Sequence, residues 1–165
     1  MTGTQQTNKS AMDVFQGKLI THDEVPVLSQ QLIWTVLKTD KAIAEKTMNI
    51  LDKEPEALNK GVGFPYVIVP VPSISEENIT MRKKELSVAF ACSVYSIQTH
   101  TLREMVGLVR SAVRKNIPIL GQLRLEHVTT NSDNMGAYEL DDGRIAYCIN
   151  MDITFRAVVQ KYSDD

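Results

Sequence analysis

Apolar residues recur at spacings of three and four positions in two stretches of the chain, which is the pattern of a helix that buries one face. The first stretch is residues 27–40. Its apolar stripe is formed by Leu28, Leu32, Ile33, Val36 and Leu37. Trp34 lies next to this stripe, where its large ring can cover the edge of a core. The pattern continues weakly through residues 42–51, and Pro55 then discourages further helix.

The second helical stretch, residues 101–115, has the clearer pattern. Its stripe is formed by Leu102, Met105, Val106, Val109 and Val113. Thr101 and Glu104 have the spacing of a capping box, in which the two side chains satisfy free backbone donors at the start of a helix. Arg114 and Lys115 suit the negative end of the helix dipole. We therefore predict a helix that begins at Thr101.

Two other stretches alternate strictly between apolar and small or polar residues, which predicts β-strands with one buried face. In residues 85–96 the apolar positions are Leu86, Val88, Phe90, Cys92 and Val94. The opposite face, from Ser87 to Tyr95, is small and weakly polar, so another element can pack on it. Residues 145–157 alternate in the same way, and we expect this long strand to be central in the sheet.

Shorter strands are predicted at residues 64–71 and 122–130. Residues 73–84 are too polar for a buried element, and we predict that they form the loop of a wide hairpin. Residues 131–134 have the composition of a turn. The Asp-Gly pair at 142–143 predicts a tight hairpin that leads into the last strand.

These elements follow the order helix, strand, strand, helix, strand, strand. We therefore predict an α+β fold in which two helices cover one face of a mostly antiparallel sheet. A length of 165 residues suits one domain, which we place at residues 26–160. Residues 1–25 are expected to form a flexible N-terminal extension, and residues 161–165 a short C-terminal tail.

Composition removes several functional classes from consideration. Hydrophobic residues make up 43% of the chain, charged residues 23%, and the formal net charge is -2. A core can therefore form, and no general basic surface for nucleic acid or an anionic membrane is expected. No apolar run is long enough to span a membrane, and the polar start of the chain lacks the apolar segment of a signal peptide. Two cysteines are too few for a disulfide scaffold, so we expect an intracellular protein with reduced thiols.

Residue types that carry chemistry in enzymes are scattered along this sequence. His22, His100 and His127 do not pair with Cys or carboxylates at the spacing of a metal site. Cys92 falls on the apolar face of its strand and is expected in the core, whereas Cys148 falls on the polar face and is expected to be more exposed. We therefore predict no enzyme activity, no catalytic residue, no metal and no cofactor.

Charged loops are the candidate contacts with partners instead. The predicted hairpin loop contains Glu76, Glu77, Arg82, Lys83 and Lys84. The turn region and the last strand add Asn134, Asp141, Asp142 and Asp152. The basic cluster at 82–84 can touch phosphate, but neighbouring glutamates offset its charge. We therefore predict protein contacts at these residues and no sequence-specific binding of nucleic acid.

The element order and several local features resemble the tail terminator, or tail completion (tail-to-head joining), proteins of tailed bacteriophages. The matching features are the sequence LIWTVL at 32–37 in the first helix, FPYV at 64–67 at the start of the first strand, the long second strand, the helix at 101–115, and the closing pair of strands. The resemblance covers residues 27–159, which is most of the chain.

This resemblance implies a ring, usually hexameric, that stacks on the last ring of the tail tube, stops its growth and presents a surface to the head connector. The implied partners are further copies of the chain, the tail tube protein and the head-tail connector protein, without a membrane. DNA can pass through the lumen of such a ring. The implied location is the tail or neck of the virion, with assembly in the host cytoplasm, and the charged loops are expected to make the axial contacts.

Three other interpretations are kept open by the sequence. Another ring-forming neck or head-completion protein would share the same features. A small-molecule-binding α+β domain would need a concave pocket with converging polar groups, and no cluster of titratable residues predicts one. A dimeric interaction domain would differ from a ring in its stoichiometry.

Overall fold

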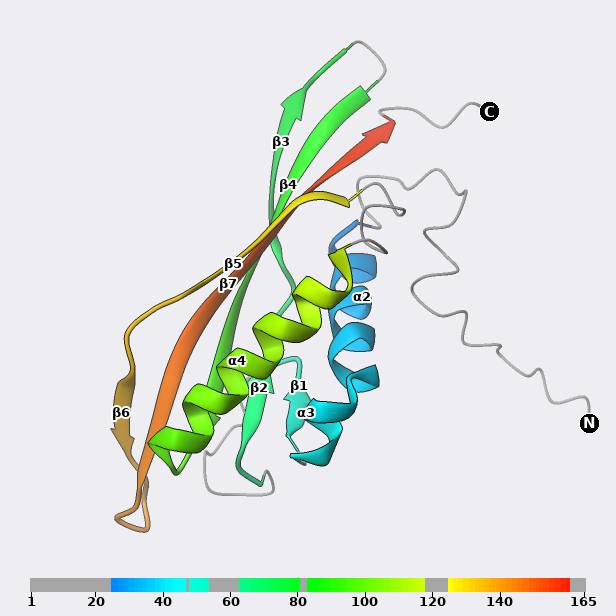
Figure 1. The fold of residues 1–165 in the computed structure, drawn as a ribbon. Helices are drawn as coiled ribbons and strands as arrows, with labels where there is room; N and C mark the ends of the chain where they lie inside the picture. Colours follow the sequence, from blue (N-terminus) through cyan, green and yellow to red (C-terminus); the bar gives the residue numbers. More distant parts are fainter. Residues whose placement is uncertain (1–24, 47, 54–62, 81–82, 118–124, 161–165) are drawn as a thin grey trace, which may run out of the picture.

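The computed structural model describes residues 25–46, 48–53, 63–80, 83–117 and 125–160. It confirms the α+β class, with helices packed on a mostly antiparallel sheet (Figure 1). The helices are α2 (Val25–Thr39), α3 (Lys41–Glu45) and α4 (Thr99–Lys115). The strands are β1 (Asn49–Leu51), β2 (Tyr66–Ile68), β3 (Ser73–Asn78), β4 (Lys83–Ser96), β5 (Leu125–Ser132), β6 (Gly136–Glu139) and β7 (Ile145–Gln160).

The two long strands predicted from alternation, β4 and β7, form the centre of the sheet. They pair antiparallel along their whole length, from Lys83 opposite Gln160 to Ser96 opposite Tyr147. The sheet order is β1-β2-β4-β7-β5, with β3 also paired to β4 and β6 also paired to β7. All pairs are antiparallel except β1 with β2. The expectation of a central last strand is therefore confirmed.

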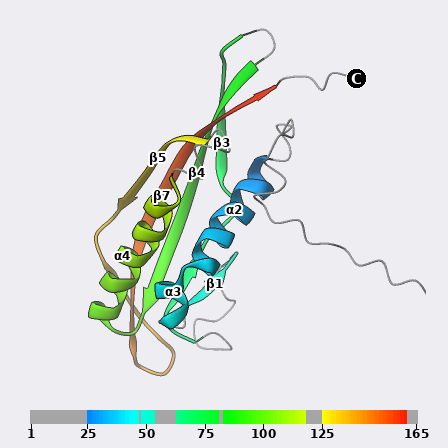
Figure 2. The ribbon, with the colours of Figure 1, turned by 45° about the vertical axis from the view of Figure 1, so that its right-hand side comes forward.

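Helices α2 and α4 lie side by side on one face of this sheet (Figures 1 and 2). Their apolar stripes meet the apolar positions of β4 and β7. The stripe predicted for α4 is buried, and the rings of Phe90 and Phe155 stand 5.9 Å apart beneath the helices. Trp34 is partly buried at the edge of this core, as predicted. Burial of these side chains is the main stabilising contribution in the domain.

The N-terminal half contains two short elements that the spacing of apolar residues did not predict. The weak helical pattern over residues 42–51 divides into the five-residue helix α3 and the strand β1. Asp40 separates α3 from α2, and its carboxylate accepts a hydrogen bond from the backbone N–H of Ile43. This N-cap starts a new helix in a different direction.

The segment predicted as a wide hairpin loop is mostly a strand. Residues 73–78 form β3, which pairs with β4 from Ser73 opposite Ala89 to Asn78 opposite Lys84. The prediction of a hairpin was right, but the prediction of a long loop was wrong. β3 is a polar edge strand in which only Ile74 packs against the core, so its sequence shows no alternation. In both views this hairpin and the end of β7 extend past the helices.

The second helix begins two residues earlier than predicted, and the capping box is absent. Gln98 is the N-cap and makes no capping hydrogen bond through its side chain. Thr101 lies inside the first turn and donates to Oε1 of Gln98, while Glu104 pairs with Lys46. The hairpin around the Asp-Gly pair is confirmed, and Gly143 adopts the φ of +82° that such a turn requires. Residues 131 and 132, predicted as a turn, instead belong to β5.

Candidate functional site

The sheet has one face without a described helix, opposite α2 and α4 (Figures 1 and 2). We call it the open face. Its position follows from the alternation in β4 and β7, because the residues between the core positions point away from the helices. The residues of the open face are Glu77 of β3, Glu85, Ser87, Ala89, Ala91 and Ser93 of β4, and Asn150, Asp152, Thr154 and Arg156 of β7.

The open face is mostly polar, and its side chains along the middle of β4, from Ser87 to Ser93, are short. Ser93 donates a hydrogen bond to Oδ1 of Asn150 over 2.9 Å, and the hydroxyls of Thr129 and Thr154 are hydrogen-bonded across β5 and β7. The guanidinium of Arg156 lies 3.3 Å from the carboxylate of Glu85. These contacts align the strands and leave a surface of small groups that another protein can approach closely.

Asp152 lies near the middle of the open face and is exposed, between Ala91 of β4 and Asn131 of β5. No ion pair to its carboxylate occurs within the part of the chain that the structure describes. The expectation that Asp152 faces away from the core is correct. Its charge is available to a partner that supplies a cation.

A second apolar cluster adjoins the open face and explains why one cysteine prediction was wrong. Cys148 is only 3% exposed, because it lies opposite Tyr95 in a group with Tyr66 and Ile68. The rings of Tyr66 and Tyr95 stack at 4.9 Å between centroids. Cys148 is therefore buried although it lies on the polar side of its strand, because bulky side chains on adjacent strands cover its thiol.

The candidate contact residues from the sequence fall into separate groups. Glu76, Glu77 and Lys84 lie in the β3–β4 hairpin, where Nζ of Lys84 is 3.1 Å from Oε2 of Glu76. Lys83 is the first residue of β4, and Arg82 lies outside the described residues. This group is at one end of the long strands (Figure 1).

The other loop candidates are at the opposite end of β7. Asn134 is exposed in the connection between β5 and β6, and Asp141 is exposed in the hairpin before β7. Asp142 accepts hydrogen bonds from the backbone N–H of Arg144 at 3.0 Å and from its Nε at 2.6 Å. These bonds, the backbone one first, hold the pKa of the Asp142 carboxyl below its usual range. The sequence therefore identified residues at two ends of the molecule, and the structure does not bring them into one site.

The residue types that hold metals are dispersed within the described ranges. No group of three or more His, Cys, Asp or Glu residues there is placed to hold a metal. Burial, reinforced by the charge of Asp152, raises the pKa of the Cys92 thiol to about 12, so this thiol is not a nucleophile at neutral pH. Its predicted place in the core is confirmed. His100 is exposed near the start of α4, and His22 lies outside the described residues.

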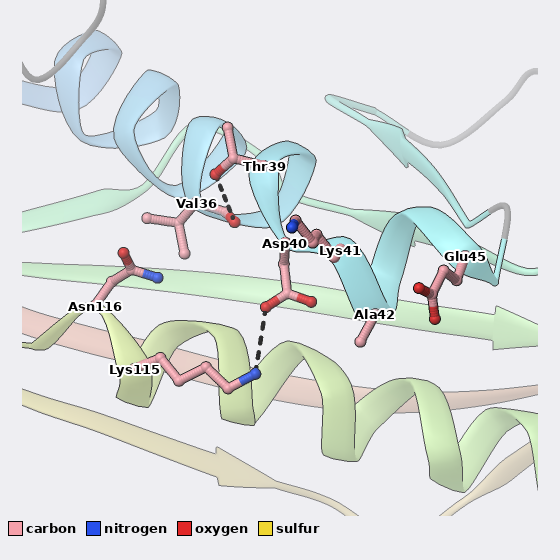
Figure 3. A pocket seen from close by; sticks show the side chains of 8 residues that line it. All are labelled: Val36, Thr39, Asp40, Lys41, Ala42, Glu45, Lys115 and Asn116. Carbon is pink, nitrogen blue, oxygen red and sulfur yellow. Dashed lines mark hydrogen bonds and ion pairs between the residues drawn. The ribbon is translucent and has the colours of Figure 1, made fainter.

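A hollow of about 480 Å³ lies between the α2–α3 junction and the end of α4 (Figure 3). Four of its six polar side chains, those of Thr39, Asp40, Lys115 and Asn116, already have partners. Asp40 caps α3 and lies 3.7 Å from Nζ of Lys115, Thr39 donates to the carbonyl of Thr35, and Asn116 donates to that of Ala112. The hollow therefore presents few unused polar groups to a small ligand. The ion pair between Asp40 and Lys115 instead joins the start of α3 to the end of α4.

The open-face residues other than Glu77 and Asp152 were not identified as contacts from the sequence. The available signal was the row of Ser and Ala between the core positions of β4, because small residues on a long strand leave room for a second layer. From the sequence, that face is predicted to be small and weakly polar, with room for another element or a neighbouring subunit to pack on it.

Comparison with known families and with curated proteins finds no match to this chain. Among solved structures, the fold is similar to that of a chain in a structure titled "Virion of native gene transfer agent (GTA) particle". The two chains are 15% identical, the match covers 79% of this chain and 93% of the other, and the TM-score is 0.44. Likeness at this level does not identify a function. None of the described helices is long and apolar enough to cross a membrane.

Proposed function

We propose that this chain is a structural virion protein that forms a ring on the end of a phage tail tube. In this role the ring ends tail growth and provides the attachment surface for the head connector. The observation that carries the proposal is the open face, a long sheet surface of small polar side chains opposite the helix layer. The pattern of elements that resembles tail terminator proteins supports the same role.

A two-layer domain of this kind is suited to ring formation. Its helix layer and its open face are different surfaces on opposite sides, so a contact between them would be heterologous. Heterologous contacts give rings when the rotation between subunits closes. An antiparallel sheet can also simply face water on one side, so the oligomeric state decides between these uses of the open face.

The two ends of the long strands supply the proposed axial contacts. The β3–β4 hairpin carries Glu76, Glu77 and Lys84 at one end. The β6–β7 hairpin carries Asp141 and Asp142 at the other. A ring with the strands running along its axis would present one set to the tail tube and the other to the connector, with DNA passing through the lumen.

The test uses tail tube protein from the genome that encodes this chain. Tubes polymerising alone should keep elongating, and addition of the purified chain should stop elongation and leave a ring at one tube end in negative-stain images. Tubes that elongate unchanged and show no added density at their ends would overturn the proposal. Replacing Glu76 by Lys should weaken capping, because Glu76 lies in the β3–β4 hairpin and outside the open face. Lys41→Glu with Lys53→Glu provides a charge-changing control on another surface.

A neck or head-completion protein is the alternative within the same class. Such a protein would bind the head connector and leave tube elongation unchanged, so the same assay with connector added separates the two. The alternative of a small-molecule-binding domain finds little support in the hollow at Asp40, where most polar groups are already engaged.

A further inference from the structure

Resting on the proposed ring, we infer that neighbouring subunits are joined by the outward side of α4 packing on the open face of the next copy. The outward side of α4 carries a row of residues spaced by three and four positions, which we call the basic stripe. Its residues are Arg103, Gly107, Arg110 and Arg114. Helical geometry places them in one line along the helix.

The two exposed arginines of the basic stripe have no neutralising carboxylate among the residues that the structure describes. They are Arg103 and Arg114. Arg110 donates to the hydroxyl of Ser132 over 2.8 Å. Glu104, the acidic residue of α4, is turned aside to Nζ of Lys46 at 2.8 Å. A positive surface therefore remains on a chain whose net charge is -2.

Gly107 is a second, independent sign of an approaching partner. Glycine in the middle of a helix destabilises it relative to alanine. A Cβ added to Gly107 would meet no atom within 4 Å, so nothing in the described part of the subunit requires glycine there. A close approach by the backbone or side chains of another chain would require it.

The open face complements the basic stripe in charge. Among the side chains that the structure describes, the carboxylates of Asp152 and Glu77 have no ion pair, whereas Glu85 is paired with Arg156. Glu77 lies opposite Glu85 of β4, and Asp152 lies opposite Ala91, six residues further along the same strand. The carboxylates of Glu77 and Asp152 are therefore separated by about 20 Å along the strands. Arg103 and Arg114 are about 16 Å apart along α4, a spacing that long arginine side chains can match.

The two surfaces also complement each other in shape. Between the two acidic positions β4 presents only Ala91, Ala89 and Ser87 outward. Between the two exposed arginines α4 presents Gly107 and the half-buried Arg110, whose guanidinium is held against β5 by its hydrogen bond to Ser132. Small groups thus face small groups at the centre of the proposed contact, with charged pairs at its ends. The helix of the next copy would supply the missing third layer of the sheet, and the contact is heterologous, as a ring requires.

Charge reversal of each surface tests this pairing. The variant with Arg103→Glu and Arg114→Glu, and the variant with Glu77→Lys and Asp152→Lys, should each lose the ring species in light scattering and on tube ends. An equal mixture should recover rings of alternating subunits, because each reversed helix then meets a reversed sheet. The matched control, Lys41→Glu with Lys53→Glu, should form rings alone.

Gly107→Trp gives a test that does not depend on charge. The variant should keep the circular dichroism and thermal unfolding of the wild type, since the position is open, and should lose the ring. Wild-type protein that never forms rings, free or on tubes, would overturn the ring and this interface together. Rings that persist in the reversed variants and in Gly107→Trp would overturn the interface alone. Intact rings with lost binding to a short DNA duplex would assign the basic stripe to nucleic acid instead.

Discussion

The two faces of β4 and β7 have the same backbone and opposite chemistry. Toward the helices, Phe90, Met151 and Phe155 are almost completely buried. Toward the open face, Ala91 and Asp152 on the same strands are exposed. The covered face therefore holds most of the folding free energy, and the open face contributes strand alignment. Because the open face contributes little to the free energy of folding, its residues can be substituted to suit assembly with little loss of stability.

The largest effect is expected from truncating a core side chain on the covered face. Phe155→Ala should lower the free energy of unfolding by about 3–5 kcal/mol, because it removes buried apolar area and leaves a cavity beside Phe90. Urea unfolding followed by circular dichroism measures the change. A loss below about 1 kcal/mol would show that the covered face does not dominate folding.

The free energy of unfolding should fall at alkaline pH because of the buried Cys92 thiol on the covered face. The folded pKa of Cys92 is raised to about 12 from 9.0, so its contribution to stability is complete below pH 9 and is lost as pH rises toward 12. At pH 10 the free energy of unfolding should be lower by about 1.4 kcal/mol on this account. Cys92→Ala should lack this part of the pH dependence, whatever its stability at pH 7. Identical slopes above pH 9 would contradict the expectation.

On the open face, removing a hydrogen bond should cost less. Asn150→Ala deletes the acceptor of the Ser93 hydroxyl and of the Cys148 thiol. The hydroxyl can turn to water at an exposed position, and a thiol is only a weak donor. The free energy of unfolding should fall by about 0.5–1 kcal/mol. Thermal unfolding of Asn150→Ala beside Phe155→Ala compares the two faces directly, and equal losses would remove the distinction between them.

The smallest effect on stability is expected at Ala91, with the largest effect on assembly. Ala91→Arg adds a long cation to an exposed position and should change the free energy of unfolding by no more than about 0.5 kcal/mol. It should nevertheless abolish rings, since it would repel the basic stripe of the next copy. Sedimentation velocity separates ring from monomer, and normal rings in this variant would contradict the use of the open face.

The sequence predicted those helices and strands whose buried residues recur at a regular spacing. α2, α4, β4 and β7 each bury one regular face, and each was found close to its observed bounds. β3 was missed because an edge strand that is polar on both sides has no alternation to detect. β1 was missed because three residues are too few to show a period, and α3 starts anew at the Asp40 cap.

The site was less accessible to sequence reasoning than the fold. Alternation placed Asp152 outside the core, but it could not show that Cys148 is covered by Tyr95 and its neighbours, since that depends on packing between distant strands. The charged loops attracted attention through composition, and register shows that they lie at opposite ends of β7. The role of Gly107 emerges only when the space around its Cα is known.

Assembly of the chain through its open face can be tested by the solution mass of the purified wild-type protein. Light scattering over a concentration series, with negative-stain images of any large species and with tail tubes added in a parallel series, gives the number of subunits. We expect a closed ring of about six subunits, free or on tube ends. A monomer or an isologous dimer at every concentration, with and without tubes, would contradict the account.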